Sequence, residues 1–229
     1  QRLLAALLVL ALGLLPPATA WSPIGEPPSG HLLIVGGGDT PAEVLARFVE
    51  LAGGAEQARI AVLPMASVDG DEEVAEIVAD LRALGAAAWR LDLSREEAED
   101  EEATERFEGI TGFWFCGGDQ VRLAAILRGT PALAAIQKRY FAGAVVGGTS
   151  AGAAVMTTAM LTGNRQQGSE GTAMPAIARG LFEIDEGFGF LPGAIVDQHF
   201  LQRSRHNRLL SAVLERPGLL GVGIDEQTA

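Results

Sequence analysis

Short apolar runs alternate with longer stretches in which apolar residues recur every three or four positions. HLLIVG precedes PAEVLARFVELA, ARIAVLP precedes DEEVAEIVADLRALG, and AAWRLDL precedes SREEAEDEEATERF. Continuous apolar runs are typical of strands buried on both faces, and the periodic stretches are typical of helices with one buried face. The alternation therefore predicts an α/β fold, with a mainly parallel sheet and helices on both of its faces.

The second half of the chain continues this pattern. Strands are expected over GFWFC, AVVGG, AIVDQHF and LLGVGI, and helices over QVRLAAILRG, PALAAIQKRYFAG, AGAAVMTTAM and LQRSRHNRLLSAVLERPG. Residues 161–193 lack a strong period and are rich in glycine and polar residues, so we expect a long functional loop there. The sequence stops at GVGIDEQTA, directly after an expected strand. A further C-terminal strand or hairpin is therefore expected to be missing.

The first twenty residues differ from the rest of the chain. An apolar run from Leu3 to Leu15 is followed by two prolines and then by Ala18-Thr19-Ala20. The run is short for a membrane span but suits the core of a signal peptide, and the small residues match a cleavage site. We expect residues 1–20 to be a signal peptide and residues 21–229 to form a single domain that is secreted or periplasmic. An uncleaved membrane anchor is the alternative.

Composition narrows the range of partners. The 229 residues are 48% hydrophobic, which is enough for one well-buried domain. The net charge is −12 and only three histidines are present, so the chain lacks the basic surface that a nucleic acid would need. Cys116 is the only cysteine and lies in the apolar run GFWFC, which indicates a buried thiol. The acidic run at 96–102 is interpreted as a solvated helix face, so no metal or other cofactor is expected.

The segment GGTSAGAAVM, residues 147–156, contains the pattern G-x-S-x-G around Ser150. Glycines on either side relieve crowding where a strand turns sharply into a helix, so the serine can adopt a strained backbone with an accessible hydroxyl. The segment therefore predicts a nucleophile elbow. The Ala151 N–H at the helix start is a natural donor to an oxyanion.

A nucleophilic serine needs a base, and the three histidines differ in their expected places. His31 opens the first strand, at the end opposite to where sites form in a parallel sheet, and His206 lies within an expected helix. His199 follows AIVDQ at the carboxyl end of a strand, where sites of parallel sheets form. Position therefore favours His199 as the base.

A carboxylate is expected to hold the imidazole, and spacing alone leaves several open. The candidates are Glu170, Glu183, Asp185, Glu186 and Asp197. The loop FCGGDQ, residues 115–120, ends another strand with two glycines, so its backbone N–H groups can turn toward an anion. Gly118 is the expected second oxyanion donor.

Three motifs together resemble a known family: GGTSAGAAVM, FCGGDQVRL with GTP following, and DQHFLQRSRHNRL. They are similar to those of the cyanophycinases, in a serine peptidase group that also contains aspartyl dipeptidases. The resemblance runs from residue 31 to residue 229. It implies a serine-type exopeptidase that degrades cyanophycin, a polyaspartate with arginine on each side-chain carboxyl, to β-aspartyl-arginine dipeptides. A signal peptide would correspond to the secreted forms.

The resemblance also implies roles for individual residues. The nucleophile falls on Ser150, the histidine on His199 and the glutamate on Glu170. Substrate contacts map to Gln120, Asp197, Gln198, Arg203, Arg205 and Arg208. Members of the group are often dimers, so a homodimer is an expectation. An aspartyl dipeptidase acting on small peptides and a catalytically silent peptide-binding protein of the same fold remain the alternatives.

The chemistry of the polymer is compatible with these residues. Each unit offers free carboxylates and a guanidinium, so arginine forks are expected for the former and carboxylates or amides for the latter. The three arginines near the start of one expected helix, Arg203, Arg205 and Arg208, could form such forks.

Overall fold

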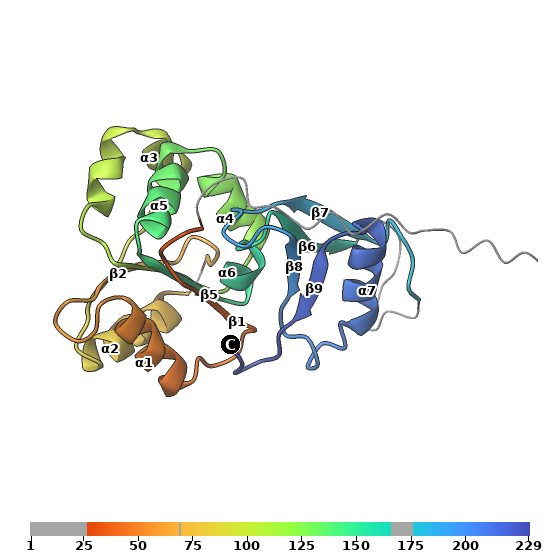
Figure 1. The fold of residues 1–229 in the computed structure, drawn as a ribbon, viewed down its shortest axis with the longest axis horizontal. Coiled ribbons are helices and arrows are strands. Elements are labelled where there is room, and N and C mark those ends of the chain that lie inside the picture. The colour runs from red at the N-terminus through yellow and green to blue at the C-terminus, as the bar shows by residue number, and fades with distance from the viewer. Residues whose placement is uncertain (1–26, 69, 166–175) are drawn as a thin grey trace, which may run out of the picture.

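A five-stranded, fully parallel sheet forms the centre of the computed structural model, which describes residues 27–68, 70–165 and 176–229 (Figure 1). The strands follow one another across the sheet in the order β1-β5-β4-β2-β3. Their bounds are β1 Leu32–Val35, β2 Arg59–Leu63, β3 Ala87–Arg90, β4 Gly112–Phe115 and β5 Val145–Thr149. The predicted α/β class with a mainly parallel sheet is confirmed.

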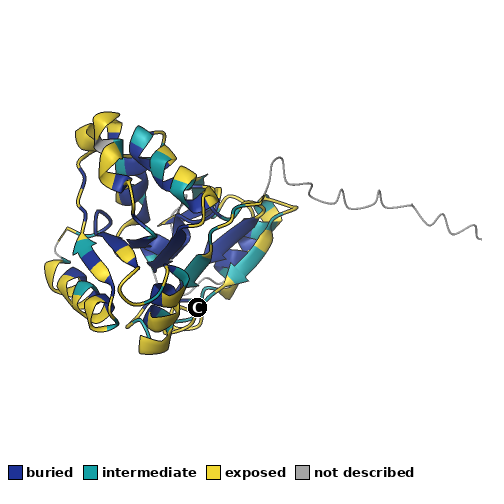
Figure 2. Ribbon diagram, turned by 60° about the vertical axis from the view of Figure 1, so that its left-hand side comes forward, coloured by how far each residue is buried: buried dark blue, intermediate teal, exposed yellow. Residues whose placement is uncertain are grey.

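Helices cover both faces of this sheet (Figure 1). One face packs against α1 Ala42–Leu51 and α2 Asp71–Ala83. The opposite face packs against α3 Arg95–Glu99, the 3₁₀ helix Glu102–Phe107, α4 Gln120–Leu127, α5 Pro131–Phe141 and α6 Ala151–Ala154. The inner strands β2, β4 and β5 and the inner helix faces are largely buried, whereas the edge strands β1 and β3 are more exposed and the outer helix faces are exposed (Figure 2).

Alternate side chains of each strand point to opposite layers, so the continuous apolar runs supply two cores at once. In β4, Phe113 and Phe115 join the core under α4 and α5, and Trp114 joins the core under α1 and α2. The Trp114 ring meets Phe48 of α1 edge to face, with ring centres 5.0 Å apart. Cys116 lies in the same core, and burial raises the pKa of its thiol to about 12. It is the buried thiol that the sequence predicts.

Two smaller sheets and a helix form the remaining part of the fold, at the right of Figure 1. β6 Ala159–Arg165 pairs antiparallel with β7 Phe182–Glu186. β8 Ala194–Asp197 pairs in parallel with β9 Leu220–Gly223, and α7 His206–Glu215 packs against them.

Two expectations about this part are wrong. The helix expected over AGAAVMTTAM ends at Ala154, and the chain re-enters a strand at Ala159. The Thr157 hydroxyl donates to the Ala159 carbonyl at 2.7 Å, a local bond that competes with helical continuation. The loop expected over 161–193 contains β7 and most of β6. Leu161 of β6 and Phe182 of β7 pack in one small core with Ile195 of β8 and Leu209 of α7.

The C-terminal segment joins β9 to the carboxyl end of β1. The Gly36 N–H donates to the Thr228 carbonyl at 3.0 Å, and the Gln227 N–H donates to the Gly37 carbonyl at 2.8 Å. A side chain at Gly36 would collide with the Asp225 carbonyl oxygen, so only glycine permits this approach. Residues after β9 are thereby placed beside the ends of β1 and β5.

Residues 1–20, the expected signal peptide, lie outside the described residues. Within the described part of the chain, no helix has the length and apolar character to cross a bilayer.

Candidate active site

Ser150 lies between the end of β5 and the start of α6, with φ +52° and ψ −108°. This left-handed backbone is costly for a serine, and strained residues of this kind cluster at functional sites. The two flanking glycines make the turn possible. A Cβ on Gly152 would collide with the Phe115 carbonyl, and one on Gly148 would lie 2.9 Å from Gly152 backbone atoms. The reason given for the glycines of the G-x-S-x-G pattern thus holds.

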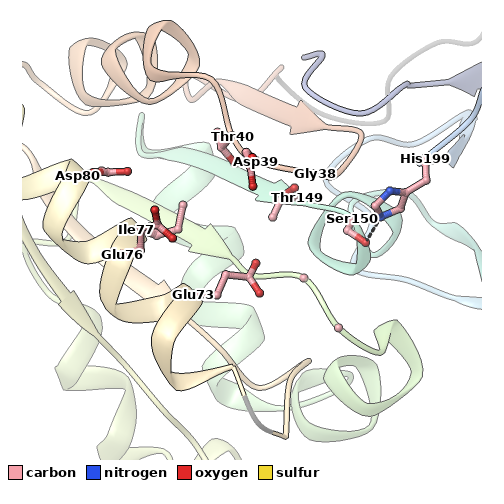
Figure 3. Close-up of a pocket in the computed structure, with 12 residues that line it drawn as sticks. Gly38, Asp39, Thr40, Glu73, Glu76, Ile77, Asp80, Thr149, Ser150 and His199 are labelled. Atoms are coloured by element: carbon pink, nitrogen blue, oxygen red, sulfur yellow. Dashed lines mark hydrogen bonds between the residues drawn. The ribbon is translucent and has the colours of Figure 1, made fainter. Parts of the chain in front are cut away.

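The structure brings His199 to Ser150. The Ser150 hydroxyl and the His199 Nε2 atom lie 2.8 Å apart (Figure 3). His199 follows β8, and its backbone N–H donates to the Gly36 carbonyl at 2.6 Å. Its ring lies against Gly37, whose φ is +113° and where any Cβ would overlap the imidazole. The end of β1 therefore fixes the ring that faces the serine.

The carboxylate on the other side of the ring is Glu226, which the sequence interpretation missed. Glu226 Oε1 lies 2.6 Å from His199 Nδ1. An ionised carboxylate only accepts, so Nδ1 carries the proton and Nε2 is free to accept from the serine. Glu226 follows β9, the parallel neighbour of β8. A carboxylate directly after the last apolar run was the signal that could have indicated it.

The predicted acid, Glu170, lies outside the described residues. The described alternatives are engaged elsewhere or do not contact the ring. Glu183 accepts from Thr162 and Asn164, Asp185 pairs with Arg128, and Asp197 is fully buried. Within the described part of the chain, Glu226 is thus the carboxylate that contacts His199. The role of Glu170 stays a prediction.

The two expected oxyanion donors lie beside the serine. Gly118 follows β4, the neighbour of β5, and has a φ of +130°. A Cβ built on the preceding Gly117 would lie 3.6 Å from the Ser150 Cβ, so this loop borders the nucleophile. Neither the Gly118 N–H nor the Ala151 N–H donates to another described residue. Both groups are therefore available to a substrate oxygen.

The surroundings of His199 favour its neutral form. Burial lowers the pKa of His199 below its ordinary value, and the positive charges of Arg203 and Arg205 lower it further. The hydrogen bond with Glu226 opposes these effects. A histidine with a lowered pKa remains an unprotonated base to a more acidic pH.

Replacing Arg203 with glutamine is expected to move the acidic limb of the kcat/KM profile to higher pH. Removing this positive charge raises the pKa of His199, so the imidazole becomes protonated, and inactive as a base, at a higher pH. Initial rates across the pH range measure the limb. Arg216→Gln, at the far end of α7, is the matched control and should leave the limb unchanged. A limb at the parental pH in both variants would contradict the electrostatic role of Arg203.

The six residues that the resemblance assigns to substrate lie in different environments. Gln120 is buried and donates from its side-chain amide to the Leu161 and Thr162 carbonyls at 2.9 and 2.7 Å. Arg205 donates to the carbonyl and the side-chain oxygen of Gln198. These contacts hold β6 and the loop after β8 in place.

Arg208 and Asp197 form a buried ion pair. The Arg208 Nε donates to Asp197 Oδ2 at 2.9 Å, and one of its Nη atoms donates to Oδ1. Asp197 is fully buried and Arg208 is 7% exposed. The Arg208 N–H groups that could bind a substrate carboxylate bidentately are thus already bonded to Asp197. Arg203 is exposed, and no hydrogen bond joins its guanidinium to the described residues.

Replacing Arg208 with methionine is expected to lower the free energy of unfolding by about 3 kcal/mol, because the buried Asp197 loses both hydrogen bonds from Arg208 and keeps only the Arg205 guanidinium, 3.6 Å from its Oδ1. Urea denaturation measures the loss. Arg203→Met, an exposed site on the turn before the same helix, is the control and should remain within about 0.5 kcal/mol of the parent. Equal midpoints for the two variants would show that the pair does not hold this part of the fold.

A cavity of about 460 Å³ extends from Ser150 and His199 between α2 and the loop after β1. Figure 3 shows its acidic lining side chains on the side away from His199: Asp39, Glu73, Glu76 and Asp80. The serine therefore lies at one end of a cavity that is open to a substrate.

A model of peptidase family S51 matches residues 32–229, which include the whole of this site. The chain belongs to peptidase family S51. It is 40% identical over 203 residues to the cyanophycinase of Geminocystis herdmanii (strain PCC 6308), covering 86% of this chain and 72% of that protein.

Further similarities agree with membership of family S51. The chain is 38% identical over 210 residues to the cyanophycinase of Synechococcus elongatus, covering 87% of this chain but 62% of that protein. It thus spans less than two thirds of that relative. The crystal structure of a peptidase from an acI-B1 Actinobacterium has a TM-score of 0.64 at 25% identity, covering 86% of this chain and 80% of the other.

Proposed function

We propose that this chain is a serine-type exopeptidase that hydrolyses cyanophycin to β-aspartyl-arginine dipeptides. The observation that carries the proposal is the line of contacts from the Ser150 hydroxyl through His199 to Glu226. The 38–40% identity with two cyanophycinases supports the choice of substrate.

In the proposed mechanism, the turn at Ser150 serves as a nucleophile elbow. Ser150 Oγ attacks the scissile carbonyl carbon while His199 Nε2 takes the hydroxyl proton. Glu226 holds the Nδ1 proton and stabilises the imidazolium that forms. The negative charge that develops on the carbonyl oxygen is received by the Gly118 and Ala151 N–H groups. His199 then protonates the leaving amine, and a water molecule, activated by the same histidine, releases the acyl group from the serine.

Incubation with insoluble cyanophycin, followed by mass spectrometry of the soluble products, tests the proposal. Release of β-aspartyl-arginine by the parent and not by Ser150→Ala is the expected result. Cleavage of small aspartyl peptides without attack on the polymer would favour an aspartyl dipeptidase. Binding of either substrate without cleavage would favour a catalytically silent protein of the same fold.

The proposal also includes export of the protein and its assembly into a homodimer. The apolar run from Leu3 to Leu15 and the small residues at 18–20 support a signal peptide removed after Ala20, with the mature protein secreted or periplasmic. N-terminal sequencing of the exported protein tests this, and retention of the run in a membrane-bound product would contradict it. A homodimer rests on the family resemblance alone, and sedimentation velocity of the mature protein would reveal a monomer if the expectation is wrong.

A further inference from the structure

The cavity beside Ser150 is acidic along one wall. Glu73, Glu76 and Asp80 come from α2, and Asp39 comes from the loop after β1. No lysine or arginine is among the described residues that line this cavity, and His199 is the only histidine there. The four carboxylates repel one another, so a cation that enters is stabilised by all of them.

A second feature of the same cavity indicates a missing hydrogen-bond partner. Thr149, the last residue of β5, lines the cavity and is 4% exposed. Its hydroxyl oxygen is buried without a hydrogen bond to any described residue. A buried hydroxyl without a hydrogen-bond partner is destabilising, so a donor or acceptor from a ligand would satisfy it. Figure 3 shows Thr149 between Ser150 and the carboxylates, on the way into the acidic end.

The spacing of the carboxylates favours an extended cation over a metal ion. Among the described residues, no three His, Cys, Asp or Glu side chains are close enough together to hold a metal. Glu73, Glu76 and Asp80 instead follow one face of α2, and seven residues of helix extend about 10 Å. Ile77 lies in the same wall and is 8% exposed. A long side chain with an apolar stem and a charged planar end matches this wall, since the stem can cover Ile77 while the end reaches the carboxylates.

We propose that this acidic cavity is the subsite for the arginine side chain of the aspartyl-arginine unit at the scissile bond. The Thr149 hydroxyl forms a hydrogen bond with the entering arginine side chain. The carboxylates of Glu76 and Asp80 accept hydrogen bonds from the guanidinium N–H groups. This inference rests on the proposed function for the position of the scissile bond, and assigns specificity to α2 and Thr149.

The test compares two synthetic oligomers of aspartate, one carrying arginine and the other citrulline on each side-chain carboxyl. Citrulline has almost the same shape but no charge. The parent is expected to prefer the arginine oligomer by about tenfold or more in kcat/KM, mainly through KM, because charge-assisted hydrogen bonds are lost with citrulline. The combined variant Glu76→Gln/Asp80→Asn is expected to lose most of this preference, mainly through a higher KM for the arginine oligomer.

Glu72→Gln is the matched control, since Glu72 belongs to α2 but does not line the cavity. It removes a charge from the same helix and should keep the preference. Thr149→Val should weaken the preference without lowering Tm, because a valine of the same shape replaces a hydroxyl that has no partner among the described residues. An equal loss in Glu72→Gln and in the combined variant would overturn the subsite and leave only a general charge effect.

Binding of both oligomers to the Ser150→Ala protein separates this inference from the proposed function. A parent that cleaves neither oligomer contradicts the proposed function. Arginine preference in binding that Glu76→Gln/Asp80→Asn removes would still support the subsite. A parent that cleaves or binds both oligomers equally overturns the subsite, whether or not the serine mechanism holds.

Discussion

Replacement of Ser150 by alanine is expected to lower kcat for the cleavage of aspartyl-arginine oligomers by about 10⁴-fold or more. In the proposed mechanism the Ser150 hydroxyl is the nucleophile, and it lies against His199 Nε2. His199→Ala should cause a similar loss, because the serine is a poor nucleophile without a base at 2.8 Å. The double variant should be no slower than either single variant, since the two residues act as one unit. Single-turnover kinetics with the arginine oligomer measure all three.

Two controls distinguish loss of chemistry from loss of structure. Ser150→Ala removes only the hydroxyl at a position fixed by its backbone, so circular dichroism and Tm should match the parent. A serine-directed covalent inhibitor should label Ser150 in the parent and leave the alanine variant unlabelled. Parental turnover by Ser150→Ala would refute the serine mechanism. Losses that multiply in the double variant would mean that Ser150 and His199 act in separate steps.

The parallel sheet and the place of the site could be predicted from the sequence because both depend on local patterns. Continuous apolar runs such as GFWFC indicate strands buried on both faces, and the structure supplies two cores on either side of Trp114. Glycines around Ser150 indicate a tight turn regardless of what packs nearby. His199 was selected because it follows an apolar run, and in the structure it follows the strand that this run forms, β8.

The partner of His199 could not be chosen in the same way, because its position depends on how distant segments dock. Glu226 reaches the ring only because β9 pairs with β8 and the following residues bond to Gly36 and Gly37. Nothing in the spacing of 27 residues between His199 and Glu226 indicates that approach. The loop after the serine contained several carboxylates, and proximity along the chain favoured them.

The arginine cluster shows a second limit of sequence interpretation. Arg203, Arg205 and Arg208 are equivalent in a sequence motif, but burial separates them into an exposed cation, a partly buried side chain and a buried ion pair. Asp197 decides this division, since it is fully buried and needs a cationic partner. Residues that a family motif would assign to substrate can thus hold one another in place instead.

Replacement of Glu226 by glutamine is expected to lower kcat by about 10³- to 10⁴-fold, because an amide can present a donor to Nδ1 and favour the wrong imidazole tautomer. Glu226 raises the pKa of His199, so its loss should also move the acidic limb of the residual activity to lower pH. The acidic limb should thus move in the direction opposite to that expected for Arg203→Gln. The two variants together test both the direction and the size of the effect on the pKa of His199.

Glu170→Gln is the decisive comparison for the choice of acid, because the family resemblance favours Glu170 and the structure places Glu226 on the ring. Glu170→Gln should retain parental kcat and an unchanged acidic limb if Glu226 orients His199. A dead Glu170→Gln beside an active Glu226→Gln would instead give the role to Glu170, and the contact at Nδ1 would then be dispensable for turnover. Loss in both variants with only Glu226→Gln moving the limb would leave Glu226 as the partner of His199 and make Glu170 a contributor through another step.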